Sequence, residues 1–371
     1  MVNLVITKLV IIKILIIFLT VILLLAVGAS FVNGPAGLLA NLTGTDMHIW
    51  LYIVFLYYII ATLLPIDKII GKVYPFMGAT LLFMAFGVGT VILAKGLSGE
   101  IQMTELTFET FRNYHNNASE YMIFPTLFIV ISCGAISGFH ATQSPLMARC
   151  IKSERQGRRI FYGAMAAEGV IALIWAAIGM AFFHGPDALV ATMAEHGNDA
   201  AWAVKTITDS TLGSVGGFIA LLGVVACAIT SGDTAFRSAR LIIADMLHYD
   251  QKPILKRLVV SIPLFAIGIA IAFMEFDVIW RYFAWSNQAL SVITLWMITS
   301  WLMRRGSRWS IIALIPAICM TYVCSSFFFV SGQFVGLGAT TSAYVYGGAA
   351  TAVIAGLMMY LIRKNIKNKV A

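Results

Sequence analysis

Ten apolar stretches, each long enough to cross a lipid bilayer, dominate the sequence. A membrane-spanning helix needs about 20 mainly apolar residues. The stretches lie near residues 10–32, 48–64, 74–94, 121–138, 160–183, 212–231, 255–273, 278–302, 309–331 and 341–362. Hydrophobic residues make up 60% of the chain, whereas soluble domains are about 45–50% apolar. We therefore predict an all-α polytopic membrane protein with about 10 transmembrane helices, in which residues 1–371 form a single membrane domain.

The lysines and arginines predict how these helices are oriented. All but four of the 25 cations fall in alternate connections or at the two ends of the chain, near 8–13, 68–72, 149–159, 237–257, 304–308 and 363–369. The exceptions are Lys95, Arg112, Lys205 and Arg281. Because cytoplasmic loops carry the excess of positive charge, we expect both termini in the cytoplasm. The first apolar stretch exceeds the 7–15-residue core of a signal peptide, so we expect a retained helix.

The net charge of +8 has a membrane explanation. A basic chain often binds a polyanion, but these cations lie at the ends of apolar stretches, beside lipid headgroups. We therefore expect membrane lipids, and no nucleic acid, among the partners. The five cysteines show no Cys-x-x-Cys spacing, and we expect no metal site and no cofactor.

The stretch SCGAISGFHATQSPLMAR (132–149) loses its apolar character before it would reach the far side of the membrane. Its glycines, Thr142, Gln143 and Pro145 predict a broken helix near 137–145. Non-helical backbone at membrane depth is tolerated where protein or a water-filled cavity satisfies it, and transporters place substrates at such breaks. The alternative is a helix that ends near Gly138 and continues as a cytoplasmic loop. The candidate substrate-binding residues here are Ser137, Gly138, His140, Thr142 and Gln143.

Glu168 lies about two turns into the stretch 160–183, among small residues. A carboxyl group in an apolar environment favours its protonated form, which suits a proton relay. A structural role, with a neighbouring helix or with Arg158 or Arg159 as the partner, agrees with the sequence equally well.

Thr230, Ser231 and Asp233 cluster near the inner end of the stretch 212–231. Their oxygen atoms are hard ligands, suited to Na⁺ or to a proton relay. The alternative is structural, because Asp233 can pair with Arg237 four residues later on a helix. If the cluster is functional, we expect H⁺ or Na⁺ as the coupling ion.

Ser286, Asn287 and Gln288 lie near the middle of the stretch 278–302. Polar groups at this depth commonly form interhelical hydrogen bonds. If they face a pore, they contact the substrate instead. Asn287 and Gln288 complete the set of candidate substrate-binding residues.

Several long segments resemble the carbon starvation protein A family. They are LPIDKIIGKVYP, SGFHATQSPLMARCIKSERQGRRIFYGAMAAEGVIALIWA, TSGDTAFRSARLIIAD and WRYFAWSNQ. The resemblance implies a secondary transporter of the bacterial inner membrane that imports small peptides or pyruvate during starvation, driven by the proton gradient. It also implies part of an inverted-repeat fold of the amino-acid/polyamine/organocation type, in which two helices are broken.

Members of this family are longer, and glycine-rich spans precede the region that resembles this chain. The resemblance therefore implies that the other broken helix is not encoded here. We expect a separate N-terminal half or a homo-oligomer as a partner, or else a truncated product that does not transport alone.

An enzyme is a third interpretation, because Ser137 and His140 are three residues apart. Serine proteases need these groups on packed elements beside an oxyanion hole, and one broken segment does not provide that arrangement. We therefore predict no catalytic residues, and the choice between peptide and pyruvate stays open at this point.

Overall fold

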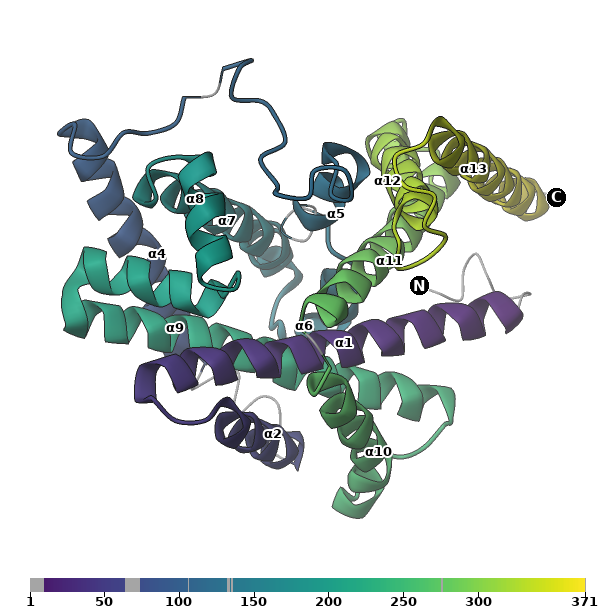
Figure 1. Cartoon of the computed structure of the whole chain (residues 1–371). Coiled ribbons are helices and arrows are strands. Elements are labelled where there is room, and N and C mark those ends of the chain that lie inside the picture. The colour runs from purple at the N-terminus through teal and green to yellow at the C-terminus, as the bar shows by residue number, and fades with distance from the viewer. Residues whose placement is uncertain are drawn as a thin grey trace. The chain divides into compact units, whose positions relative to one another are not determined.

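A computed structural model describes residues 10–63, 74–105, 107–131, 134, 136–274 and 276–370. All regular elements in these residues are helices (Figure 1). In chain order they are α1 (Val10–Thr43), α2 (Met47–Leu63), α4 (Tyr74–Leu97), η2 (Ile123–Leu127), α5 (Phe128–Ile131), α6 (Gly138–Cys150), η3 (Glu154–Gln156), η4 (Arg158–Tyr162), α7 (Gly163–Phe182), α8 (Pro186–Glu195), α9 (Ala200–Met246), α10 (Ile254–Ala272), α11 (Phe276–Arg304), α12 (Ser310–Val330) and α13 (Thr341–Val370).

Seven segments of the described chain are long and apolar enough to cross a membrane. They are Ile16–Thr43, Tyr74–Leu97, Glu154–Phe182, Ala200–Met246, Ile254–Ala272, Ser310–Val330 and Thr341–Ile366. Met47–Thr62 is a shorter apolar helix. The predicted all-α polytopic membrane protein is thus confirmed, whereas the ten spans and the orientation of the termini stay predictions. Lys8, Lys68 and Lys72, which contribute to the predicted orientation, lie outside the described residues.

The chain forms two compact units, each with buried apolar clusters of its own. The first unit comprises Met1–Leu23, Asn117–Met147 and Trp280–Ala371, and the second comprises Leu24–Asn116 and Ala148–Ile279. That these units make one membrane domain stays a prediction.

In the first unit, α12 packs against α13, α5 and η2. The core includes Trp296 of α11, whose indole N–H donates a hydrogen bond to the Thr321 hydroxyl of α12 at 3.1 Å. Gly347 brings α13 close to α12, because a Cβ there would lie 2.8 Å from Ser326 Cα. Small residues allow such close approach between membrane helices.

In the second unit, α9 contacts α2, α4 and α10, and α4 also contacts α7. The ring of Phe236 on α9 packs against two glycines, Gly28 of α1 and Gly268 of α10. A Cβ on Gly28 would lie 2.5 Å from the ring, and a Cβ on Gly268 would lie 2.6 Å from it. The glycines therefore make the space that this buried ring occupies.

Helix α9 extends beyond the predicted stretch 212–231 at both ends. It begins at Ala200, where Asp199 Oδ1 accepts a hydrogen bond from the Ala201 N–H at 2.8 Å, and it continues to Met246. At Gly213 the backbone leaves the helical conformation, with φ 69° and ψ 177°, values that favour glycine. The predicted start near 212 therefore marks a kink within a longer helix.

The interruption of the fourth apolar stretch is confirmed, but its predicted position near 137–145 was too late in the chain. The π-helical η2 and the short α5 end at Ile131, and α6 begins at Gly138. Thr142 and Ser144 do not break α6, because their hydroxyls donate to the carbonyls of Phe139 and His140, each at 2.7 Å. Polar side chains that bond back to the preceding turn are compatible with a helix. The alternative of a cytoplasmic loop after Gly138 was wrong.

Candidate functional site

The interruption ends where α6 starts against the middle of α11. Gly138 is buried there, and a Cβ on it would lie 2.7 Å from Leu290 Cβ and 3.0 Å from the Ser291 nitrogen. The same Cβ would also collide with the carbonyl oxygen of Asn287. Glycine is therefore required for packing at this crossing, and its predicted contact with substrate stays a prediction.

Asn287 caps the start of α6 from the neighbouring helix. Its side chain is fully buried, and Oδ1 accepts hydrogen bonds from the Phe139 N–H at 2.7 Å and the Ser137 hydroxyl at 3.1 Å. The first N–H groups of a helix have no partner within the helix itself. An amide from α11 thus provides the cap that α6 needs, and the Ser137 hydroxyl donates to this amide.

Gln288 contacts the other side of the interruption. It is also fully buried, and its Nε2 donates to the Ile129 carbonyl at 3.4 Å. Ile129 lies in the last turn before α5 ends, where carbonyl groups lack helical partners. The Ser291 hydroxyl supports this side chain with a 3.2 Å hydrogen bond to Oε1. Two consecutive amides of α11 therefore satisfy both ends of the broken helix.

The remaining substrate-binding candidates lie in the first two turns of α6. His140, Thr142 and Gln143 are half-buried, and Gln143 Nε2 donates to the Thr142 hydroxyl at 3.0 Å. The structure thus brings all seven candidates to one place in the first unit, around the break and the middle of α11. Whether they contact a substrate stays a prediction.

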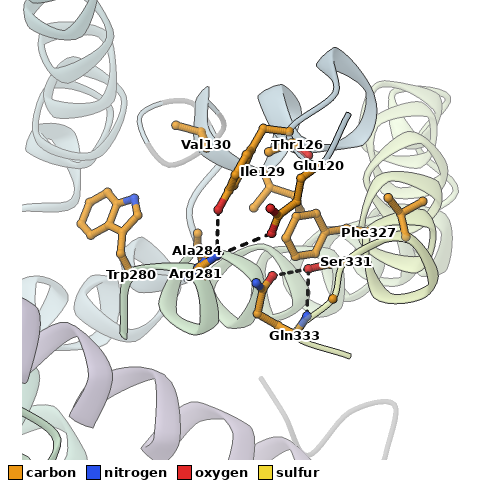
Figure 2. Close-up of a pocket in the computed structure, with 13 residues that line it drawn as sticks. Glu120, Thr126, Ile129, Val130, Trp280, Arg281, Ala284, Phe327, Ser331 and Gln333 are labelled. Atoms are coloured by element: carbon orange, nitrogen blue, oxygen red, sulfur yellow. Dashed lines mark hydrogen bonds and ion pairs between the residues drawn. The ribbon is translucent and has the colours of Figure 1, made fainter. Parts of the chain in front are cut away.

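A cavity of about 120 Å³ lies one to two turns of α11 from the break (Figure 2). Its lining is mainly apolar and includes Ile129, Ala284 and Phe327. The charged lining residues are Glu120 and Arg281. The sequence predicts Arg281 only as an outer cation and not as part of a cavity, although a cation between Trp280 and Tyr282 in an apolar stretch is an available signal.

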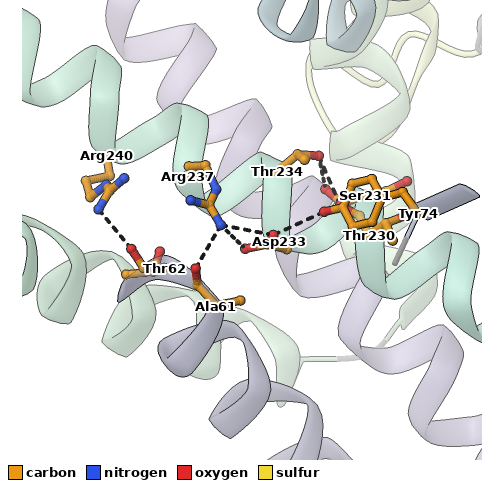
Figure 3. A network of polar contacts seen from close by, with 9 residues as sticks. All are labelled: Ala61, Thr62, Tyr74, Thr230, Ser231, Asp233, Thr234, Arg237 and Arg240. Carbon is orange, nitrogen blue, oxygen red and sulfur yellow. Dashed lines mark hydrogen bonds and ion pairs between the residues drawn. The ribbon is translucent and has the colours of Figure 1, made fainter. Parts of the chain in front are cut away.

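The ion-coupling candidate Asp233 belongs to a buried polar network in the second unit (Figure 3). Its carboxylate lies 3.2 Å from Arg237 Nη2 and accepts a hydrogen bond from the Tyr74 hydroxyl at 3.2 Å. Arg237 also donates to the Ala61 carbonyl at 2.8 Å, and Arg240 donates to the Thr62 carbonyl at 3.2 Å. Cations are favourable at helix C-termini, so the two arginines hold the end of α2.

The pairing of Asp233 with its i+4 neighbour is the structural alternative expected from the sequence. The Thr230 and Ser231 hydroxyls likewise serve their own helix, donating to the Cys227 carbonyl at 2.8 Å and 3.1 Å. Glu168, by contrast, is exposed on α7. No group of three or more His, Cys, Asp or Glu side chains suited to a metal ion occurs among the described residues. An ion-coupling role for these four residues stays a prediction.

Comparison with known proteins identifies the family. Residues 2–215 and 203–326 match the family described as carbon starvation protein CstA. The chain belongs to the CstA family. The resemblance inferred from the sequence motifs is therefore confirmed, and with it a multi-pass location in the bacterial inner membrane.

Individual relatives match parts of the chain. An uncharacterized membrane protein of Haemophilus influenzae is 49% identical over 155 residues, which cover 39% of this chain and 42% of that protein. The peptide transporter CstA of Helicobacter pylori is 43% identical over 53 residues, 14% of this chain and 8% of that protein. The pyruvate/proton symporter BtsT of Escherichia coli is 45% identical over 53 residues, 14% of this chain and 7% of that protein. The aligned regions thus span less than half the length of these three relatives.

Proposed function

We propose that this chain forms the substrate pathway of a secondary active transporter, which imports small peptides or pyruvate across the bacterial inner membrane and uses the proton gradient. The names of two relatives, a peptide transporter and a pyruvate/proton symporter, support this class of substrate. Nutrient starvation, the condition in the family's name, is the setting in which such uptake would be needed.

The observation that carries the proposal is the broken helix between Ile131 and Gly138, whose two ends are held by Asn287 and Gln288. Broken helices in transporters expose backbone N–H and C=O groups to the substrate at membrane depth. A chain that needed only a membrane anchor would have no use for two buried amides at such a break. In this proposal Ser137, His140, Thr142 and Gln143 present polar groups to the substrate next to the break.

The coupling ion is proposed to be H⁺, with Na⁺ as the alternative. Glu168 would carry the proton, because it is an exposed carboxyl group within the membrane-crossing segment Glu154–Phe182. Thr230, Ser231 and Asp233 would respond to the ion, and their present hydrogen bonds would have to rearrange for them to bind it. We propose no cofactor and no catalytic residue.

Uptake into proteoliposomes tests this function. The full chain is reconstituted and supplied with labelled pyruvate or labelled dialanine, with an inward pH gradient, with an inward Na⁺ gradient, or with neither. Accumulation of one substrate under the pH gradient is the expected result. Accumulation that depends on Na⁺ alone would reject the proton and keep the transporter.

The same assay tests the need for a partner that the sequence predicts. The chain is reconstituted alone or together with a separately expressed N-terminal half of a longer family member. Uptake only in the mixture would show that the chain acts as half of a transporter. Absence of uptake in both preparations, with correctly inserted protein, would reject the proposed function.

A further inference from the structure

The cavity beside the break is shaped for a small molecule. Its walls come from α11 and from η2 and α5, and Phe327 to Gln333 close one side (Figure 2). Its volume of about 120 Å³ is several times the 10–15 Å³ that one ordered water needs, and it is smaller than the about 300–1,000 Å³ of pockets for drug-sized ligands. A molecule of a few non-hydrogen atoms fits these dimensions.

The charge in this cavity favours an anion with one apolar end. Arg281 Nη1 donates to the Tyr121 hydroxyl at 2.7 Å, and Glu120 Oε1 is 3.9 Å from the same nitrogen. At 3.9 Å the carboxylate is beyond direct hydrogen-bond range, and the Glu120 side chain is 48% exposed. Ion pairs with such an exposed partner contribute little free energy. A carboxylate that comes close enough to accept two hydrogen bonds from the guanidinium would therefore displace Glu120.

The position of Arg281 connects the cavity with the break. Arg281, Ala284 and Gln288 follow one face of α11, because they are spaced three and four residues apart. Arg281 and Gln288 are therefore separated by about 10 Å along the helix axis. Ile129, which lines the cavity, is also the residue whose carbonyl accepts the hydrogen bond of Gln288. The cation distribution predicts that the Arg281 end of α11 faces the outside of the cell.

We propose that this cavity is an outer binding site for carboxylates. Arg281 binds the carboxylate of a small organic acid or the terminal carboxylate of a short peptide, while the apolar walls accept the methyl group or side chain. The site deepens the proposed transport function and rests on it, since it would receive the substrate before the break. It also explains how pyruvate and peptides, which share a carboxylate, could both be recognised by one chain.

Equilibrium dialysis of the purified full chain with labelled pyruvate and labelled dialanine tests the site. We expect saturable binding of at least one, competition by unlabelled dialanine, and at least tenfold weaker competition by dialanine amide, which lacks the carboxylate. Arg281→Gln should weaken binding about tenfold to a hundredfold, and Arg281→Lys should fall between this variant and the wild type. Equal competition by the amide, or no binding of either probe, would overturn the proposal.

The control for Arg281→Gln is Arg112→Gln. Arg112 is a second outer cation that also lies beside an acid and a tyrosine, 2.8 Å from Asp187 and 4.7 Å from the ring of Tyr114, but it is more exposed than Arg281. Tyr114 and then Asp187 hold the pKa of Arg112 above its usual value, so Arg112→Gln also removes a full positive charge. Binding should be unchanged in this variant. A loss of binding equal to that of Arg281→Gln would show a general effect of charge and overturn the proposed site.

A second variant distinguishes a loss of binding from a loss of folding. Glu120→Gln removes the competing carboxylate and should tighten pyruvate binding about two- to fivefold, the range expected from an exposed ion pair. A folding defect would not give tighter binding. Glu109→Gln, an exposed acid in the second unit, is the matched control. Weaker binding in Glu120→Gln would contradict the proposal.

The carboxylate site and the transport function can fail separately. Carboxylate binding without any uptake would reject only the transport function. Uptake of dialanine amide as fast as dialanine would reject only the carboxylate site.

Discussion

Asn287 shows how one buried side chain can determine whether a broken helix is stable. Its Oδ1 is the partner of both the Phe139 N–H and the Ser137 hydroxyl. The Asn287 side chain is fully buried, so a donor beside it that lost this partner would carry a desolvation cost. The amide is thus required by the structure whether or not it also contacts substrate.

Replacing Asn287 by Ala should lower the free energy of unfolding by about 1–3 kcal/mol, because two half-buried donors lose their acceptor. Titration with a denaturing detergent, followed by circular dichroism, would measure this loss. Thr294→Ala is the control, since the Thr294 hydroxyl only bonds back to the Leu290 carbonyl of its own helix at 2.9 Å. Equal stability of the two variants would show that the cap contributes nothing.

The Asp233–Arg237 pair should behave as a coupled unit. Because both side chains are buried, Asp233→Asn should lower the free energy of unfolding by about 3–5 kcal/mol, as removal of one partner leaves an uncompensated charge. A double-mutant cycle with Arg237→Gln should give a coupling energy of about 0.5–3 kcal/mol. The exposed pair Lys95–Glu100, changed in the same way, should give about 0–1 kcal/mol. Additive effects at Asp233 and Arg237 would contradict the pairing.

At the scale of elements, the crossing of α6 and α11 depends on the absence of a side chain at Gly138. The nearest atoms of α11 include the backbone of Asn287 and Ser291, which cannot rotate away as a flexible side chain would. The distance between the two helices is therefore determined by this glycine, and so is the reach of Asn287 Oδ1 to the start of α6.

Gly138→Ala should consequently lower the free energy of unfolding by about 1–3 kcal/mol through overpacking. Gly163→Ala is a matched control, because Gly163 starts α7 with ordinary helical φ and ψ and a Cβ there meets no atom within 4 Å. That control should be neutral or stabilising by about 0.4–1 kcal/mol. The same detergent titration measures both variants, and a stable Gly138→Ala would mean that the helices do not cross this closely.

The sequence predicted the elements best where apolar runs end in polar residues. The stretches 255–273 and 309–331 match α10 (Ile254–Ala272) and α12 (Ser310–Val330) within one residue at each end. The sequence did not predict the ends of α9, because this helix continues into polar residues on both sides. It did not predict the helix α6 either, because the hydroxyls of α6 bond to the backbone of their own helix. Residue type alone does not reveal either outcome.

The candidate site was only partly predictable. Asn287 and Gln288 stood out as polar residues in an apolar stretch, but their partners at Phe139 and Ile129 are about 150 residues away in the chain. The place of Arg281 in a cavity depends on Tyr121 and Phe327, which no local pattern connects with it. Contacts between distant segments were therefore the part that sequence could not provide.

At the scale of the whole molecule, the test is whether proton movement and substrate movement are coupled. Glu168→Gln removes the ionisable group while keeping the shape of the side chain. We expect it to abolish the stimulation of uptake by an inward pH gradient, because the variant cannot take up and release a proton. Uptake should be measured at several external pH values with the gradient present and with it collapsed by an ionophore.

Glu154→Gln is the control for this experiment, since Glu154 is an exposed acid in η3, before α7. It should retain the full response to the gradient. An unchanged response in Glu168→Gln would assign the proton to another group. Loss of the response in both variants would point to surface charge and not to a relay.

The adjacency of Asn287 and Gln288 restricts how the first unit can move. One amide faces the start of α6 and the next faces the end of α5. A slide of α11 by a single residue, about 1.5 Å, or a turn of about 100° about its axis would carry both amides off their targets together. We therefore expect the two halves of the broken helix and α11 to move as one body, so that any conformational change of the first unit would take place outside this three-helix assembly.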